Sequence, residues 1–353
     1  MDDGVSPAGL DIRAFDRWLS EHEPALRGDG PVRATLLAGG LSNLTYRLDG
    51  ATRPLVLRRP PLGHVLSTAH DMGREYRVLS ALHGTRVPVP QPVLFEPDAD
   101  AGAGVGAPFY LMERVDGVTL VSPADNAAWT PAELRELSLS LARTLAELHA
   151  IDPRTVGLDD FGRPDGFLER QMRRWATQYA GNRFRDLPDL DALLARLAES
   201  IPETRSTSIV HGDYRLDNAL VVRGPRGPRI AAVLDWEMAT VGDSLSDIGL
   251  LGLYWELPEA VGDIATARTS VDVAAGYPAF PELLDAYAAA RGIELPELGW
   301  YLAFAAAKLA IILEGVQLRH DQGETVGPGF DRVGELVPAL AASGLRRLTG
   351  VRR

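Results

Sequence analysis

Residues 210–218 place an aspartate and an asparagine five residues apart, and a further aspartate ends an apolar run later in the chain. These three residues are Asp213, Asn218 and Asp235. A carboxylate can accept or orient the proton of a hydroxyl group, and carboxylate and amide oxygens are ligands for a hard cation such as Mg²⁺. This order of residues is typical of phosphoryl transfer. We therefore predict that Asp213 is the catalytic base and that Asn218 and Asp235 bind Mg²⁺.

The neighbouring sequence strengthens this interpretation. The apolar runs at residues 208–210 and 230–234 predict short strands that would hold the ends of the two loops. A His-x-Asp-x₄-Asn string is weak evidence by itself. Together with a strand-ending aspartate and the later Gly242-Asp243-x₃-Asp247, it becomes a strong indication of phosphoryl transfer. The alternatives without a catalytic role are that Asp213 is a solvated loop residue and that Asp235 only caps a turn.

Several segments resemble the aminoglycoside phosphotransferase family, which includes choline and homoserine kinases. The resemblance lies in residues 211–213 (His-Gly-Asp) and 235–237 (Asp-Trp-Glu), and it extends to residues 39–46, 57–61 and 242–247. The branch most similar to this chain includes the kinase-like domain fused to some acyl-CoA dehydrogenases. The resemblance covers about residues 30–320. It implies an α+β, protein-kinase-like fold of two lobes: a small antiparallel-sheet N-lobe and a larger, mostly helical C-lobe.

The apolar periodicity agrees with this division. We predict a helix at 10–26, then strands at 33–37, 43–48, 55–58, 93–95 and 109–115, with a helix at 68–83. Residues 1–115 would form the nucleotide-binding lobe and residues 116–353 the lobe with the catalytic loop and acceptor pocket. In the second lobe the predicted helices lie at 130–148, 165–179, 245–256, 280–291, 296–318 and 330–345. We expect the loop at 98–106, rich in Gly, Ala and Asp, to be mobile.

The resemblance implies nucleotide contacts in the first lobe, with ATP as the phosphate donor. Gly40, Ser42 and Asn43 lie in a turn that could contact phosphates, although a double glycine between strands is often only a hairpin turn. Arg58 stands where the family has a lysine, and Glu75 would be its ion-pair partner. A guanidinium is planar and bidentate, so it is not a copy of an ammonium group. The alternative is that both are surface charges.

The family also implies where the adenine and the acceptor bind. Backbone groups of Glu113 and Val115 would meet the adenine in the segment that joins the lobes. Residues 165–179 and 301–320 would line the acceptor pocket, where arginines serve an anionic or acyl-bearing substrate or are simply solvated. We expect His211 to be structural, Asp243 to accept hydrogen bonds from the catalytic-loop backbone, and Asp247 to cap the next helix.

Composition excludes several classes of protein. The 353 residues are 46% hydrophobic and 24% charged, which is ordinary for a globular protein. The net charge of −12 gives no electrostatic support for a nucleic-acid partner, and the absence of cysteine excludes disulfides and thiolate metal sites. The amino terminus lacks the pattern of a secretory signal. Residues 300–313 predict a buried core helix rather than a membrane span. We therefore expect a cytoplasmic protein without a membrane partner.

These observations favour an ATP- and Mg²⁺-dependent kinase that phosphorylates a hydroxyl group of a small molecule. A protein kinase is disfavoured, because no Ala-Pro-Glu follows Asp235 and only eleven residues separate it from Asp247. A third interpretation is a non-catalytic nucleotide-binding scaffold, suggested by the missing lysine. The basic segment at 345–353 argues against cationic antibiotics as acceptors and favours a metabolic alcohol or hydroxyacyl compound.

Overall fold

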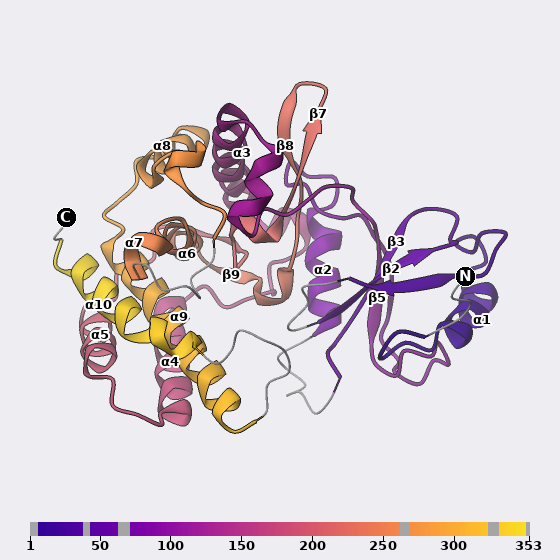
Figure 1. The fold of residues 1–353 in the computed structure, drawn as a ribbon, viewed down its shortest axis with the longest axis horizontal. Helices are drawn as coiled ribbons and strands as arrows, with labels where there is room; N and C mark the ends of the chain where they lie inside the picture. Colours follow the sequence, from indigo (N-terminus) through magenta and orange to yellow (C-terminus); the bar gives the residue numbers. More distant parts are fainter. Residues whose placement is uncertain (1–5, 38–42, 63–70, 262–268, 324–331, 351–353) are drawn as a thin grey trace. The chain divides into compact units, whose positions relative to one another are not determined.

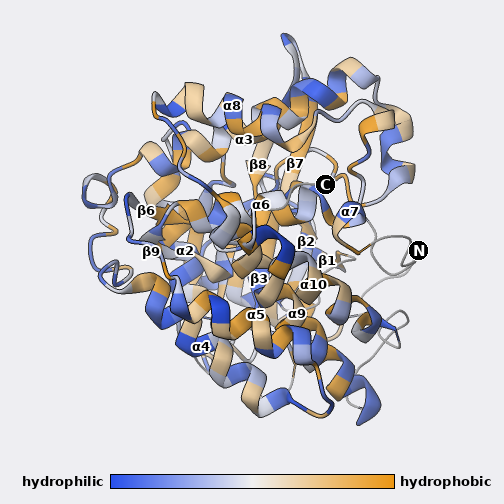
Figure 2. Cartoon of the chain, turned by 90° about the vertical axis from the view of Figure 1, so that its left-hand side faces the viewer, coloured by the Kyte–Doolittle hydropathy of each residue, from blue (hydrophilic) through white to orange (hydrophobic). Residues whose placement is uncertain are grey.

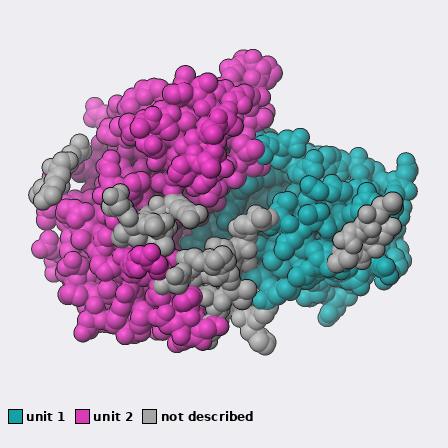
Figure 3. Space-filling model, in the orientation of Figure 1, with its two compact units in different colours: residues 1–117, 231–239 teal, residues 118–230, 240–353 magenta. Residues whose placement is uncertain are grey.

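The computed structural model describes residues 6–37, 43–62, 71–261, 269–323 and 332–350. The chain forms two compact units (Figure 3). Unit 1 comprises residues 1–117 and 231–239, and unit 2 comprises residues 118–230 and 240–353. The segment 231–239, which carries Asp235, thus joins unit 1, whereas the sequence analysis assigned it to the second lobe.

Unit 1 is built on a five-stranded antiparallel sheet with the strand order β1-β2-β3-β5-β4. Its helices and strands are α1 Ile12–His22, β1 Arg33–Leu36, β2 Leu44–Asp49, β3 Leu55–Arg59, α2 Met72–Leu82, β4 Pro92–Glu96 and β5 Phe109–Glu113. Figure 1 shows α1 and α2 on opposite sides of this sheet.

Alternation along β3 and β5 explains this layering, because successive side chains of a strand point to opposite faces. Leu55, Leu57 and Leu111 pack in one core cluster with Phe15 and Trp18 of α1. Arg58 and Tyr110, which are register partners, lie on the face that meets α2. The strands therefore bury an apolar face under α1 and present a polar pair to α2.

The loop at 98–106 is anchored rather than free of the core, contrary to our expectation. Ala103 and Val105 are buried. The Gly104 carbonyl accepts a hydrogen bond from Asp11 at 2.8 Å, and the Val105 carbonyl accepts one from Arg59 at 2.6 Å. The Gly/Ala/Asp composition could not reveal these contacts, because they are made by backbone carbonyls.

Unit 2 is mostly helical. Its longer elements are α3 Pro131–Ala150, α4 Phe167–Asn182, α5 Pro188–Glu199, β6 Thr207–Val210, β7 Ala219–Gly224, β8 Gly227–Val233, β9 Thr240–Asp243, α6 Leu245–Trp255, α7 Leu257–Val261, α8 Phe280–Arg291, α9 Gly299–Asp321 and α10 Leu336–Leu348. The last three residues of β8 belong to unit 1. Helix α3 begins with a capping box, in which Thr130 and Glu133 exchange hydrogen bonds at 3.3 and 2.9 Å.

Amphipathic helices enclose the core of unit 2. Helices α5 and α10 carry both hydrophobic and hydrophilic residues (Figure 2), and Leu190, Leu193 and Leu197 of α5 are buried at helical spacing. Helices α6 and α9 pack closely at Gly249, where an added Cβ would lie 2.5 Å from the Tyr301 carbonyl oxygen. This contact brings α9 beside the segment that follows β9.

Helix α9 has 23 residues, as many as the helix predicted at 296–318, and begins three residues later. Within the described residues it is the one helix long and apolar enough, by length and composition, to cross a membrane. Its 23 residues include an 18-residue window with a mean hydropathy of 1.5, of which 61% is buried inside the protein. It packs against α4, α5, α6 and α10. This burial is typical of a core helix.

Candidate active site

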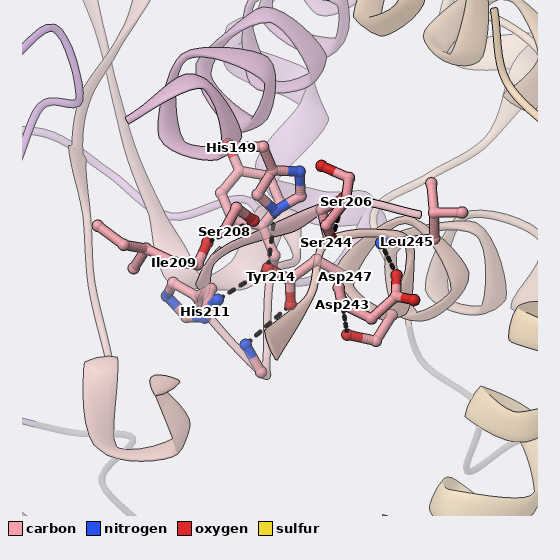
Figure 4. Close-up of polar contacts among 12 residues, drawn as sticks. His149, Ser206, Ser208, Ile209, His211, Tyr214, Asp243, Ser244, Leu245 and Asp247 are labelled. Atoms are coloured by element: carbon pink, nitrogen blue, oxygen red, sulfur yellow. Dashed lines mark hydrogen bonds and ion pairs between the residues drawn. The ribbon is translucent and has the colours of Figure 1, made fainter. Parts of the chain in front are cut away.

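The loop after β6 carries Asp213 and is fixed by hydrogen bonds to its backbone. The N–H groups of His211 and Gly212 donate to the two carboxylate oxygens of Asp247, at 2.7 and 2.8 Å (Figure 4). The Asp213 N–H donates to Nδ1 of the fully buried His211 at 3.2 Å. Buried backbone N–H groups need acceptors, so this carboxylate and imidazole determine the path of the loop. His211 has the geometry predicted for a structural residue.

Asn218 is in direct contact with Asp213. It lies in the 3₁₀ turn Leu216–Asn218, and its Nδ2 donates to the carbonyl oxygen of Asp213 at 2.9 Å and to carboxylate Oδ2 at 2.8 Å. The amide nitrogen is thus turned toward Asp213. The amide oxygen makes no hydrogen bond with the described residues and can accept a cation.

The predicted roles of Asp243 and Asp247 are exchanged. Asp247 accepts the hydrogen bonds from the catalytic-loop backbone. Asp243 instead accepts from the Leu245 N–H at 2.9 Å, at the start of α6, and from the Tyr301 hydroxyl at 3.0 Å. Strands β6 and β9 are antiparallel with Thr207 opposite Asp243, so Asp243 lies at the end of β6 remote from the loop. Helix α6 then brings Asp247 back to it.

A buried histidine that the sequence analysis did not select completes the Asp247 network. His149 of α3 contacts Asp247 Oδ2 through Nε2 at 3.2 Å (Figure 4). Its Nδ1 contacts the Tyr287 hydroxyl at 2.8 Å. Burial alone would raise the pKa of Asp247, but His149, together with His211 and the loop N–H groups, holds it below its usual value. In the sequence, His149 is merely one residue near the end of an apolar helix.

Lys308 of α9 is the only lysine of the chain, and the structure brings it to the catalytic loop. Its Nζ donates to the Gly212 carbonyl oxygen at 2.8 Å and lies 5.5 Å from the centroid of the Trp175 ring. Burial lowers the pKa of Lys308, an effect that Asp213 and Asp247 oppose. Trp175 and Lys308 lie in the two segments predicted to line the acceptor pocket.

A small hollow also opens beside the catalytic loop. It is lined by Arg215, Leu216, Asp217, Leu251, Tyr254, Trp255, Leu257, Thr269 and Val271. Within it, the Arg215 guanidinium pairs with Asp217 and lies 4.2 Å from the centroid of the Tyr254 ring. Burial raises the pKa of Tyr254, and the nearby Asp213 adds to this effect. The hollow adds α6 and α7 to the elements that border the loop, which the sequence did not predict.

In unit 1, Arg58 joins two acidic side chains. Its Nε donates to Glu75 of α2 at 3.0 Å and its Nη2 to Asp235 at 2.5 Å. Burial alone would lower the pKa of Arg58, but Glu75, Tyr110 and Asp235 raise it above its usual value. Burial also raises the pKa of Glu75, although Arg58 opposes this effect. The predicted Arg58–Glu75 pair is therefore present and buried, rather than being two surface charges.

Asp235 has an unusual backbone conformation. With φ of +63°, it is the only residue other than glycine in the left-handed region within the described ranges. Such a conformation costs about 1–3 kcal/mol and is concentrated at functional sites. Carboxylate Oδ1 is bonded to Arg58, whereas Oδ2 makes no hydrogen bond within the described part of the chain. The strained backbone thus presents one oxygen that a ligand can use.

Of the predicted phosphate-binding turn, the structure describes Asn43, while Gly40 and Ser42 lie outside the described residues. Asn43 is 1% exposed, and its Nδ2 donates to Glu237 Oε2 at 3.0 Å. Its Oδ1 is buried and has no partner in the described structure. Asn43, directly before β2, therefore links this end of the strand to the segment that carries Asp235.

The predicted adenine contacts at Glu113 and Val115 have different surroundings. The Glu113 N–H donates to the Gln91 carbonyl at 2.8 Å, and its carboxylate pairs with Arg53 at 2.6 Å. This N–H is already used within unit 1, so it is not free to meet an adenine. The backbone of Val115 makes no hydrogen bond with any described residue, so it has both groups to offer.

The donor atoms fit a hard divalent cation. The Asn218 amide oxygen and the second Asp235 oxygen are the neutral and anionic oxygen donors that Mg²⁺ prefers. No group of three or more His, Cys, Asp or Glu residues that could hold a metal occurs among the described residues. Mg²⁺ is usually bound by one or two carboxylates together with phosphate oxygens and water.

A polar Arg–Glu pair between an antiparallel sheet and a helix, and an Asp–Asn loop in a helical unit, are features of a kinase-like phosphotransferase. The model of the phosphotransferase enzyme family matches residues 33–304, and the chain belongs to this family. Family membership supports a small-molecule phosphotransferase.

The curated relatives are larger proteins. Over 349 residues, the chain is 34% identical to acyl-CoA dehydrogenase family member 11 of Rattus norvegicus, a match that covers 96% of this chain and 43% of the relative. It is 30% identical to the probable acyl-CoA dehydrogenase IBR3 of Arabidopsis thaliana, with 79% and 35% covered. The chain thus spans less than half the length of these relatives.

Solved structures confirm the kinase-like fold. A protein from Ralstonia eutropha JMP134, described as a candidate aminoglycoside phosphotransferase, is 30% identical with a TM-score of 0.81, and the match covers 98% of this chain and 100% of that chain. Aminoglycoside phosphotransferase APH(4)-Ia, in a ternary complex with AMP-PNP and hygromycin B, is 16% identical with a TM-score of 0.60 and coverage of 94% and 98%. At this identity the second likeness concerns the fold alone. The predicted α+β, kinase-like fold is therefore correct.

Proposed function

We propose that this protein transfers the γ-phosphate of ATP, in the presence of Mg²⁺, to a hydroxyl group of a small molecule. The observation that carries the proposal is that hydrogen bonds fix the Asp213 carboxylate and its loop. Its carboxylate is bonded to Asn218, and its loop is held by the buried carboxylate of Asp247. A base fixed in this way can be aimed at one acceptor oxygen, and positioning is the main requirement of phosphoryl transfer.

In the proposed reaction, Asp213 hydrogen-bonds the acceptor hydroxyl and receives its proton as the oxygen attacks the γ-phosphorus. A new oxygen–phosphorus bond forms, and the bond from the γ-phosphorus to the β–γ bridging oxygen breaks, leaving ADP. Arg58 supplies a positive charge for the phosphates, and Glu75 fixes its direction. Mg²⁺ bound by Asn218 and Asp235 would neutralise phosphate charge.

The acceptor we propose is a neutral or anionic alcohol, such as a hydroxyacyl compound, and not an aminoglycoside. Support comes from the charges around the catalytic loop of unit 2. Lys308 contacts Gly212, and Arg215 lies at the border of the hollow beside Asp213. Arg215 is paired with Asp217, so Lys308 is the cation of the two that would disfavour a polycationic amine at the loop. The relatives named as acyl-CoA dehydrogenases are consistent with an acyl-bearing acceptor.

The test is phosphate transfer from ATP to a panel of hydroxyacyl thioesters, sugars, amino alcohols and aminoglycosides, followed by the Asp213→Ala variant. We expect transfer to an acyl-bearing alcohol, and a loss of kcat of about 10²–10⁴-fold in the variant with nucleotide binding nearly intact. Asp186→Asn is the matched control, because the Asp186 side chain is 98% exposed and remote from the loop in sequence. Wild-type turnover in Asp213→Ala would refute the assignment of the base.

The rival proposal is a nucleotide-binding scaffold, for which the arginine at position 58 is the motivating observation. A scaffold would be stabilised by ATP yet would transfer phosphate to no member of the panel. The same experiments therefore separate the two functions.

A further inference from the structure

Lys308 contacts the one glycine whose conformation sets the direction of Asp213. The chain has 36 basic residues, and this is the only lysine among them. Its ammonium group donates to the Gly212 carbonyl oxygen at 2.8 Å. That carbonyl belongs to the peptide group that joins Gly212 to Asp213. Lys308 is therefore hydrogen-bonded to the peptide group that directly precedes the Cα atom of the proposed base.

Gly212 has a φ of +83°, a left-handed conformation that glycine adopts readily. A glycine also has the widest choice of other conformations, so the loop needs external contacts to keep this one. Three contacts do so: the Gly212 N–H donates to Asp247, the Gly212 carbonyl accepts from Lys308, and the Asp213 N–H donates to His211. Lys308 supplies the only one of the three that ends on the carbonyl oxygen. The Asp213 N–H bond to His211 restrains the same planar peptide group from its other side.

The surroundings of Lys308 suit an ammonium group and not a guanidinium. The carboxylates of Asp213 on the loop and Asp247 on α6 attract its charge, and Arg174 on α4 repels it. The ring of Trp175 lies 5.5 Å away, a distance at which a cation is attracted to an aromatic face. An ammonium is a compact point charge that can serve these partners at once, whereas the planar fork of an arginine needs more room.

We propose that Lys308 is a positioning residue for phosphoryl transfer, which orients Asp213 toward the acceptor by holding the Gly212 carbonyl. This role rests on the proposed function of Asp213. It explains why a lysine stands here in a chain that otherwise uses arginine. It also assigns to α9 a part in setting the rate of transfer.

The first test measures kinetics with the best acceptor for the wild type, Lys308→Met, Lys308→Gln and the control Arg196→Gln. Met keeps the length of the side chain without the hydrogen bond, and Gln keeps a donor without the charge. We expect Met to lower kcat by about 10²-fold, since a misplacement of about 1 Å has an effect of this size. KM for ATP should stay within about twofold of wild type. A change in KM without a change in kcat would mean that Lys308 contributes equally to ground-state and transition-state binding, which is not the role proposed. Arg196→Gln should have the kcat and KM of the wild type, because Arg196 is an exposed residue of α5.

A merely structural lysine would give a different result in a rescue experiment. In Lys308→Ala, added methylammonium or ethylammonium should restore kcat in proportion to its concentration, whereas neutral alcohols of the same size should not. Neither amine should affect the wild type or Arg196→Gln. Loss of stability without rescue by an ammonium ion would assign Lys308 to the core packing of α9 and overturn the proposal.

Hydrogen–deuterium exchange tests the same contact without using activity. Peptides that contain residues 211–216 should exchange at least about tenfold faster in Lys308→Met and Lys308→Gln, and those from α3 should be unchanged. If no acceptor is phosphorylated by the wild type, the proposed function fails, and the exchange result still decides whether Lys308 holds the loop. Unchanged exchange and unchanged kcat in both variants would overturn the role of Lys308.

Discussion

At the scale of single residues, Arg58 stands where the resemblance to the family implies a lysine. A lysine would offer one point charge, whereas Arg58 donates through separate nitrogen atoms to Glu75 and Asp235. Its Nη1 also approaches the Thr45 hydroxyl at 3.4 Å. The guanidinium thus links the α2 carboxylate to the proposed metal ligand. Held by these two carboxylates, the Arg58 guanidinium is the group proposed to contact the phosphates.

We expect Arg58→Lys to keep or raise activity, because lysine supplies the point charge that the family uses. Arg58→Ala should lose about 2–4 kcal/mol of transition-state stabilisation, comparable to removing one preorganised donor. The measurement is kcat/KM for ATP in both variants. Arg47→Ala is the matched control, because Arg47 is a β2 arginine that is 41% exposed and pairs only with Asp49 among the residues described. Wild-type kcat/KM in Arg58→Ala would contradict the assignment.

At the scale of elements, the catalytic loop depends on the pairing of β6 with β9 and on the first turn of α6. Asp247 accepts from two loop N–H groups and from His149. An asparagine has one acceptor oxygen and would turn its amide donors toward at least one of these groups. The element therefore requires a carboxylate at this position.

We expect Asp247→Asn to lower the free energy of unfolding by about 3 kcal/mol, because it breaks a buried and charged hydrogen-bond network. The pKa of Asp247 is below its usual value in the folded protein. Its stabilising effect is therefore complete above the unfolded pKa of about 3.9 and is lost as the pH falls through the lower folded pKa. Urea unfolding between pH 7 and pH 2 should show this loss in the wild type, beginning as the pH falls through about 4.

The Asp247→Asn variant should lack that part of the acid dependence, whereas the exposed-site variant Asp186→Asn should keep it. An equal slope of stability against pH in the wild type and in Asp247→Asn would show that another group is responsible. A variant as stable as the wild type at pH 7 would contradict the buried network itself.

The elements of the fold and the set of site residues could be predicted more fully than the contacts between them. The loop of Asp213 and Asn218 follows from the spacing of these residues, and the Arg58–Glu75 pair follows from the resemblance to the family. The exchange of Asp243 and Asp247 could not, since it depends on the register of β6 with β9, and β9 lacks a clear strand pattern. The roles of His149 and Lys308 arise from helix packing between distant segments, which leaves no local signal.

At the scale of the whole molecule, the two compact units supply different parts of the proposed chemistry. Unit 2 holds Asp213 and Asn218, and unit 1 holds Arg58, Glu75 and Asp235. Asp235 belongs to unit 1 because residues 231–239 pack there, with the Val233 N–H donating to the Pro88 carbonyl at 2.8 Å. The proposal thus assigns one Mg²⁺ ligand to each unit. Metal-dependent nucleotide binding is the property of the whole chain that tests this assignment.

We expect Asp235→Asn to weaken the binding of Mg²⁺–ATP far more than that of metal-free ATP, because Asp235 is proposed to bind the metal. In the wild type, Mg²⁺–ATP at 100 times its Kd should raise the free energy of unfolding by about 2.7 kcal/mol. Calorimetric titration and thermal unfolding with and without Mg²⁺ measure both effects. Asp116→Asn, at a unit 1 side chain that is 88% exposed, is the control and should bind as the wild type does. Equal losses with and without Mg²⁺ would instead give Asp235 a structural role, as the partner that holds Arg58.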